Sequence, residues 1–297
     1  MTQFLQALVN GVSVAAIYAL IALGFVIIYK SMQVLSFAQP GLLLLGGYWV
    51  VYFATVWNLS FWIAVILAVV LAALIGVVIE RGLLRPMVGK PVFTVAIMTI
   101  GIDLMIRIVT LDLIGVNVRS TGDPWGLKQF AIGDLVVAHR QVAAIVTIAV
   151  LFTGLVLFFK YSRIGLAMRA TAFDQEIALS QGVSVTVVFA LSWAIASVLA
   201  MAGGVFLGSG FGFGPAASVS ALKALPVVVV GGLDSIKGAL VGALLIAVTE
   251  MLAKTYQPQY ADWLGSGFSQ VVPYLVMFIV LLIRPYGLFG TEEVERV

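Results

Sequence analysis

Residues 61–79 read FWIAVILAVVLAALIGVVI, an apolar run without one charged or amide side chain. A hydrophobic stretch of about 20 residues is long enough to cross the hydrocarbon core of a bilayer as a helix. Inside that core the backbone polar groups must be hydrogen-bonded within the protein, and a single segment achieves this only as a helix. The run therefore predicts a transmembrane helix.

The rest of the chain shares this character. Of its 297 residues, 62% are hydrophobic and 10% are charged, whereas a soluble domain is about 25% charged. The chain has no cysteine and a single histidine, His139, which excludes disulfides and any metal site built on several histidines. The net charge of +3 is modest, and the basic residues fall in loops beside apolar runs, which indicates membrane orientation and not nucleic-acid binding.

Other apolar runs predict the remaining crossings. We expect an all-α integral membrane protein, a polytopic helical bundle with about eight full spans and one short broken or re-entrant segment. We interpret residues 1–297 as one transmembrane domain. The full spans are expected at residues 8–29, 42–57, 61–79, 92–115, 142–159, 185–207, 239–252 and 271–283, and the broken one at 221–230.

The lysines and arginines of the short loops orient the chain, because cytoplasmic loops carry an excess of them. The basic loops at residues 80–91 and 160–184 lie on one side, since two spans separate them. We expect the amino terminus outside, and the 160–184 segment and the carboxyl terminus in the cytoplasm. Residues 116–140 then form an extracytoplasmic loop, with a small hairpin at residues 130–137 around Gly133 and Asp134.

Two segments carry the same interruption, a proline, four aliphatic residues and a glycine pair: residues 40–47 and 226–232. Matching Pro/Gly-interrupted segments in two halves of a chain indicate the central path of a transporter. The plainer interpretation is that small residues serve close helix packing. We favour the path, and the residues expected to line it are Ser36, Phe37, Gln39, Pro40, Gly41, Pro226, Gly231 and Gly232.

The longest polar island between two apolar runs is residues 160–182. Apolar residues recur there every three to four positions, which predicts a helix over residues 167–180 with Gly182 as its stop. Arg163, Arg169 and Asp174 are left for water or a partner. The segment is either a handle that another protein pushes or a surface helix lying on lipid headgroups.

Few ionisable residues lie inside the spans. Asp103 and Arg107 are four residues apart and share a helix face, which favours an internal ion pair. Glu250 and Lys254 repeat that spacing. No chain of carboxylates and histidines suggests proton coupling, and no Gly-x-x-x-x-Gly-Lys-Ser/Thr motif for ATP occurs.

The chain resembles ABC-importer permeases of the branched-chain amino acid type, the LivH/LivM family. The resemblance rests on motifs in order along nearly the whole chain: Asn10-Gly11, Tyr18-Ala19-Leu20, Ile79-Glu80-Arg81, Ser162-Arg163-Ile164-Gly165, Arg169-Ala170, Asp174, Ala178, Gly182, Gly231-Gly232, Gly238, Gly242, Glu250 and Arg284-Pro285 with Gly287.

The resemblance implies that the 160–184 segment sits in a cleft of an ATPase subunit, through Arg163, Gly165, Arg169, Asp174 and Gly182. It implies a permease without enzymatic activity in a bacterial inner membrane. The implied partners are membrane lipid, a second permease subunit (identical or homologous), two ATPase subunits that bind ATP and Mg²⁺, and an extracytoplasmic substrate-binding protein. No cofactor, metal or nucleic acid is expected on this chain.

One motif departs from the family. Where the family often reads Asn-Phe-Ala-His-Gly-Glu, this chain has Ser36-Phe37-Ala38-Gln39-Pro40-Gly41, so the histidine and the glutamate are absent. The substrate class implied by the resemblance is branched-chain or other small amino acids, or amides. The alternatives from the residues alone are an ion-coupled secondary transporter with inverted repeats and, with little support, an intramembrane enzyme.

Overall fold

A computed structural model gives the arrangement of the chain and describes residues 2–87, 90–114, 119–209, 212–214, 216–265 and 267–291. The chain is helical almost throughout. Its helices are α1 (Thr2–Met32), α2 (Gln39–Thr55), α3 (Phe61–Ile79), α4 (Val92–Ile114), α5 (His139–Tyr161), α6 (Arg163–Phe173), α7 (Gln175–Ser180), α8 (Val185–Gly208), α9 (Ala216–Leu222), α10 (Ala224–Gly231), α11 (Ile236–Tyr260) and α12 (Val272–Ile283). Short helical turns are η1 (Glu80–Leu84), η2 (Arg85–Met87), η3 (Asp262–Leu264) and η4 (Phe268–Gln270).

Within the described residues, six helices are long and apolar enough to cross a membrane: α1, α3 with its following turns, α4, α5, α8 and α11. The helical membrane bundle predicted from the sequence is confirmed. α2 has 17 residues and α12 has 12, and the segment predicted as broken is split into α9 and α10. The count of eight full spans therefore stays a prediction.

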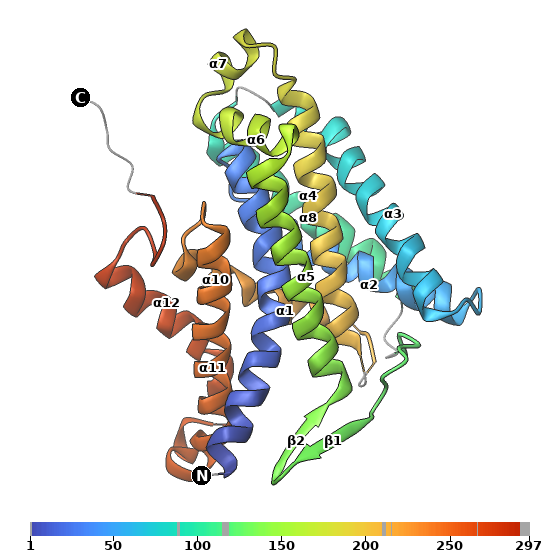
Figure 1. Cartoon of the computed structure of the whole chain (residues 1–297), viewed down its shortest axis with the longest axis vertical. Coiled ribbons are helices and arrows are strands. Elements are labelled where there is room, and N and C mark those ends of the chain that lie inside the picture. The colour runs from blue at the N-terminus through green and yellow to red at the C-terminus, as the bar shows by residue number, and fades with distance from the viewer. Residues whose placement is uncertain are drawn as a thin grey trace.

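The core is organised around α1, which packs along α8 and α11 through the middle of the bundle (Figure 1). In its most apolar stretch 83% of the residues are buried, against 28%, 22% and 17% in α3, α4 and α5. Gly11 lets α11 approach, since a Cβ there would lie 3.0 Å from Val248 Cα. Helices α3, α4 and α5 are thus peripheral, and their exposed apolar side chains suit lipid.

The strands β1 (Gln129–Ile132) and β2 (Leu135–Ala138) form the predicted hairpin, with Gln129 opposite Ala138 and Ile132 opposite Leu135. Gly133 has φ +62°, which the tight turn requires. The hairpin and the N-terminus of α1 lie at one end of the bundle, and α6 and α7 lie at the other (Figure 1). Of the predicted extracytoplasmic loop, residues 116–118 lie outside the described residues.

Candidate functional site

The segment at residues 160–184, called the coupling segment below, begins with a capped helix. The Ser162 hydroxyl oxygen accepts a hydrogen bond from the Gly165 N–H at 2.8 Å, which satisfies a free donor at the start of α6. A Cβ at Gly165 would lie 2.5 Å from the Phe158 carbonyl oxygen. Gly165 therefore lets α6 turn tightly against the end of α5.

The coupling segment contains two helices, so the single helix predicted over residues 167–180 is wrong. Asp174 is extended, with φ −159°, and ends α6. Its carboxylate accepts hydrogen bonds from the N–H groups of Glu176 and Ile177, at 2.8 and 2.9 Å, and so starts α7. Asp174 is thus a helix cap, and it is not simply left for water or a partner as its charge suggested.

Gly182 is the stop that the sequence predicted. It follows α7 with φ +80°, a conformation that glycine adopts without strain. Its N–H donates to the Leu179 carbonyl oxygen at 3.0 Å, and the Val183 N–H donates to that of Ala178 at 3.0 Å. These bonds satisfy the last carbonyls of α7.

The coupling segment exposes large apolar side chains. Phe173 is 87% exposed and lines a cavity beside the end of α1. Small or medium-sized residues, Gly165, Met168, Thr171 and Ala178, face inward. The outward apolar side chains, with Phe173, are Ile164, Leu166, Ile177 and Leu179. Contiguous exposed apolar surface rimmed by polar residues marks an interaction site, and Arg163 and Arg169 are exposed on the same helix.

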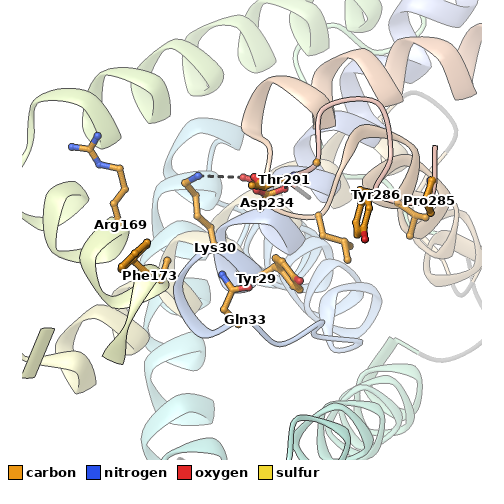
Figure 2. A pocket seen from close by; sticks show the side chains of 13 residues that line it. Tyr29, Lys30, Gln33, Arg169, Phe173, Asp234, Pro285, Tyr286 and Thr291 are labelled. Carbon is orange, nitrogen blue, oxygen red and sulfur yellow. Dashed lines mark hydrogen bonds between the residues drawn. The ribbon is translucent and has the colours of Figure 1, made fainter. Parts of the chain in front are cut away.

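A cavity of about 610 Å³ opens beside the coupling segment (Figure 2). It lies between the end of α1, α6, the turn from α10 to α11, and the segment that follows α12. Lys30 reaches across it to donate to the Asp234 carbonyl oxygen at 3.2 Å, whereas the Arg169 guanidinium points away from Asp234 in Figure 2. Residues from both halves of the chain therefore line this cavity together with α6, at one end of the bundle.

Asp234 holds the segment after α12 in place at this cavity. Its carboxylate accepts a hydrogen bond from the Thr291 hydroxyl and one from the Thr291 N–H at 3.3 Å. The next residue, Ser235, caps α11: its hydroxyl oxygen accepts a hydrogen bond from the Gly238 N–H at 3.0 Å.

The first Pro/Gly segment is the start of α2. Pro40 stands in the first turn, where a missing N–H leaves no hydrogen bond unmade. Pro40 thus marks the start of α2, in keeping with the expected break between the spans at residues 8–29 and 42–57. The Gly41 N–H donates to the Asp103 carboxylate at 2.6 Å, and the Phe37 N–H donates to the Thr99 hydroxyl at 2.9 Å. These two bonds tie the start of α2 to α4.

The predicted ion pair in α4 is confirmed. Arg107 Nε lies 2.7 Å from the Asp103 carboxylate. The Asp103 carboxylate thus contacts Arg107 on its own helix and Gly41 on α2, and so ties α2 to α4. Both sides of the carboxylate are engaged.

Gln39 is fully buried, and so is Ser36. The Gln39 side chain packs beside Gly24 of α1 and close to α8. A Cβ added at Gly24 would lie 2.7 Å from Gln39 Oε1 and 3.2 Å from the Ala196 carbonyl oxygen. Within the part of the chain that is described, neither amide atom of Gln39 has a hydrogen-bond partner. A buried amide without partners is costly.

The second Pro/Gly segment belongs to α10 and its end, and the span predicted as broken is divided at Lys223 into α9 and α10. Pro226 again stands in the first turn, here of α10. Gly231 packs on α11 so closely that a Cβ would lie 2.3 Å from the Gly238 carbonyl oxygen. Gly232 has φ +106° and ends the helix. The end of α10 is therefore held against α11 by a close backbone contact that only glycine permits.

The segment after α12 completes α10. The last carbonyls of a helix have no partner within it. Here the Val230 and Gly231 carbonyl oxygens accept hydrogen bonds from the N–H groups of Leu288 and Phe289, at 2.8 and 3.0 Å. The end of α10 is thereby satisfied by other backbone groups of the same chain.

A buried polar network stands at the division of α9 and α10, and the sequence analysis missed it. The Lys223 ammonium pairs with one oxygen of the Glu250 carboxylate on α11. The other oxygen accepts a hydrogen bond from the Tyr18 hydroxyl of α1 at 2.8 Å. Glu250 does not pair with Lys254 as its spacing suggested. The sequence signal for this network is Lys223, a single lysine between two apolar stretches of the span expected to be broken.

The two Pro/Gly segments pack on different neighbours. α2 packs against α3, α4, α8 and α9, whereas α10 packs against α1, α11 and α12. Their proximity along a common path stays a prediction, and α1 and α9 both contact α2 and α10. No cluster of three or more metal-ligating side chains occurs among the residues described.

Comparisons with known proteins were made on the whole chain. A family model described as "Branched-chain amino acid transport system / permease component" matches residues 7–281. The high-affinity branched-chain amino acid transport system permease protein BraD of Pseudomonas aeruginosa is 29% identical over 99% of this chain and 98% of that protein. The corresponding protein LivH of Escherichia coli is 30% identical over the same shares. The solved structure of PsaBC from Streptococcus pneumoniae in complex with Fab aligns over 94% of this chain and 91% of that chain, with 15% identity and a TM-score of 0.48.

Proposed function

We propose, from the premise that this chain belongs to the family of branched-chain amino acid transport system permease components, that it carries branched-chain or other small amino acids, or amides, across a bacterial inner membrane. The chain is the membrane subunit of an ATP-binding-cassette importer. ATP and Mg²⁺ are bound by two partner ATPase subunits, and a second permease subunit and an extracytoplasmic binding protein complete the system. The family match over residues 7–281 supports a single permease domain.

The observation that carries the coupling role is the outward apolar face of the coupling segment. A helix lying on lipid headgroups would turn such a face toward the membrane. Here Phe173 and Ile177 are exposed. They lie on α6 and α7, which are only about three and two turns long and stand at one end of the bundle (Figure 1). The segment is also fixed at both ends, by Ser162 and Gly182. A rigid apolar projection of this kind fits a cleft in an ATPase subunit and transmits its movement.

Phe173→Ser tests this role. The side chain is almost fully exposed, so folding of the chain is expected to be unchanged, and contact with the ATPase subunit is lost. We expect co-purification of ATPase with the permease to fall at least tenfold. Ile132→Ser, an exposed apolar position on the hairpin at the other end, is the matched control. Equal ATPase recovery from both variants contradicts the proposal.

The orientation follows from the basic residues that gather at the coupling end. Lys30, Lys160, Arg169 and Lys237 line two adjoining cavities there, which supports a cytoplasmic position. α2, α12 and the pair α9–α10 then complete the crossings, which gives eight full spans, one broken span and an external amino terminus. Because the chain has no cysteine, single cysteines report the side without background.

Gln181→Cys and Asp134→Cys test the orientation. Both residues are exposed, and neither caps a long helix. An impermeant maleimide is expected to label the residue-134 cysteine in intact cells, and the residue-181 cysteine only in inverted vesicles. The reverse pattern contradicts the orientation.

For the path itself we keep the residues of the two Pro/Gly segments: Ser36, Phe37, Gln39, Pro40, Gly41, Pro226, Gly231 and Gly232. Two local features support this: a buried amide at Gln39 without a hydrogen-bond partner among the described residues, and a span split at Lys223. Discontinuous helices line binding sites in transporters. No observation favours an ion-coupled secondary carrier.

A further inference from the structure

A second cavity, of about 810 Å³, lies between α3, α5 and α8. It exists because α5 packs along α1 and α6, while α3 packs on α8, so α5 stands apart from both. Its walls are almost wholly apolar and include Val65 of α3, Val146 of α5 and Val205 of α8. Trp62 and Val146 are largely exposed, so the groove opens sideways toward the lipid.

The groove has the length of one membrane leaflet. Its lining runs over residues 61–69 of α3, 139–151 of α5 and 198–206 of α8. At about 1.5 Å per residue these stretches are roughly 12, 18 and 12 Å long. One leaflet contributes about 15 Å, half of a hydrocarbon core of roughly 30 Å. All three stretches lie at the hairpin end of their helices, which is the proposed outer side.

An aromatic roof closes the outer end of the groove. Trp125 stacks on Phe206 with ring centroids 5.9 Å apart and meets the edge of Phe61 at 5.3 Å. Its indole N–H donates to the Ser209 hydroxyl. Tryptophan gathers at the boundary between hydrocarbon and headgroups, so this roof marks the level at which headgroups begin.

An exposed cation lines the groove at this level. Lys128 forms no ion pair with any residue that the structure describes. The carboxylate of Asp123 is engaged elsewhere, since it accepts from the Thr121 hydroxyl at 2.7 Å and the Gly126 N–H at 2.8 Å. The described lining of the groove contains no aspartate or glutamate. An ammonium-bearing headgroup would therefore find no counter-charge, while a phosphate finds Lys128.

We infer that this groove is a binding site for an anionic phospholipid of the outer leaflet. One acyl chain fills the space between α3, α5 and α8, and the phosphate pairs with Lys128 above the Trp125 roof. The lipid replaces the helix contact that α5 lacks on this side. The site is separate from the coupling segment and from the Pro/Gly segments.

Bound lipid in the purified importer complex tests the inference. Phosphatidylglycerol per permease chain is measured by mass spectrometry after graded detergent washing. Val146→Trp fills the groove, and Lys128→Glu repels the phosphate. Val150→Trp changes an exposed residue one turn further along α5 that does not line the groove. Lys254→Glu changes another exposed lysine, near the carboxyl end of α11 and outside the groove lining. These two are the matched controls.

We expect both test variants to lose about one tightly held phosphatidylglycerol per chain, and both controls to retain it. Equal retention in all four variants overturns the inference, because the lipid is then only part of the general annulus. Val142→Trp, which also lines the groove and is exposed, replaces Val146→Trp if that complex does not assemble.

A second measurement separates lipid from a neighbouring subunit. Val146→Cys carries a photoactivatable maleimide in the groove, as the only cysteine in the chain. Adducts with the mass of phosphatidylglycerol support the inference. A cross-link to another protein chain overturns it, since the groove is then filled by a partner helix.

Discussion

The Lys223–Glu250 pair gives the sharpest test of how the broken span is held. The side chains are only 14% and 7% exposed, and both lie on spans at membrane depth. Lys223→Met removes one charge at nearly constant length and leaves the Glu250 carboxylate buried with Tyr18 alone. Removing one partner of a buried ion pair destabilises a protein by about 3–5 kcal/mol.

The double variant Lys223→Met, Glu250→Gln leaves no buried charge. Replacing both members of such a pair is often neutral, so we expect its free energy of unfolding within about 1 kcal/mol of the wild type. If each single change costs about 3 kcal/mol, additive effects would cost the double variant about 6 kcal/mol. Its expected loss is at most about 1 kcal/mol, so the coupling free energy between the two residues is about 5 kcal/mol. Lys254→Met, an exposed lysine four residues after Glu250, is expected within about 0.5 kcal/mol.

The assay is unfolding of the purified chain in mixed micelles, followed by circular dichroism against the mole fraction of dodecyl sulfate. Uptake by the reconstituted importer is measured beside it. Additive single effects, or a loss in Lys254→Met equal to that in Lys223→Met, would refute the geometry. Restored stability without restored uptake in the double variant would show that the pair also serves transport.

Three further outcomes follow from single contacts. Asp174→Ala removes the cap of α7 and should destabilise that helix by about 1 kcal/mol, seen as faster hydrogen exchange at residues 175–180, while Asp174→Asn keeps the protection. Gly231→Ala places a Cβ 2.3 Å from the Gly238 carbonyl oxygen and should lower the yield of folded complex by a free-energy loss of about 1–3 kcal/mol; Gly154→Ala, with nothing within 4 Å, should not. Gln39→Leu removes a buried amide without described partners and should keep or raise the melting temperature of the complex in detergent. A lower melting temperature would show that the amide bonds to water or substrate. Uptake measured on the same sample tests the role of Gln39 in the path.

Hydrophobic length predicted the helical membrane bundle well. The run at residues 61–79 coincides with α3, because Ser60 and Glu80 bound it in the sequence as they do in the structure. The hairpin was also predictable, since Gly133 supplies the turn. Such features depend on neighbouring residues alone, and the physics that sets them is local.

Two local signals have a second meaning. Pro40 and Pro226 suggest interruptions of the path, but proline in a first helical turn is equally a start signal. The charge of Asp174 suggests a free carboxylate, but aspartate is also a preferred helix cap. In both cases the backbone groups left unpaired at helix ends decided the outcome.

The buried network could not be derived from spacing. Lys223 lies between α9 and α10, Glu250 lies on α11 and Tyr18 lies on α1. The i,i+4 rule pairs residues on one helix face, so it predicts Lys254 as the partner of Glu250. In the structure Lys254 is exposed at the surface. The choice between the two lysines is made by how α9, α10 and α11 pack, and no single segment encodes that.

The bonds from Leu288 and Phe289 to the end of α10 set an order of assembly during synthesis. Gly231 leaves the ribosome roughly 58 residues before Phe289, which is about 3–12 s at 5–20 residues per second. During that interval the carbonyls of Val230 and Gly231 lack their final partners. The broken span is therefore the last of the described crossings to mature, and a nascent chain halted before residue 288 carries an unfinished helix in the bilayer.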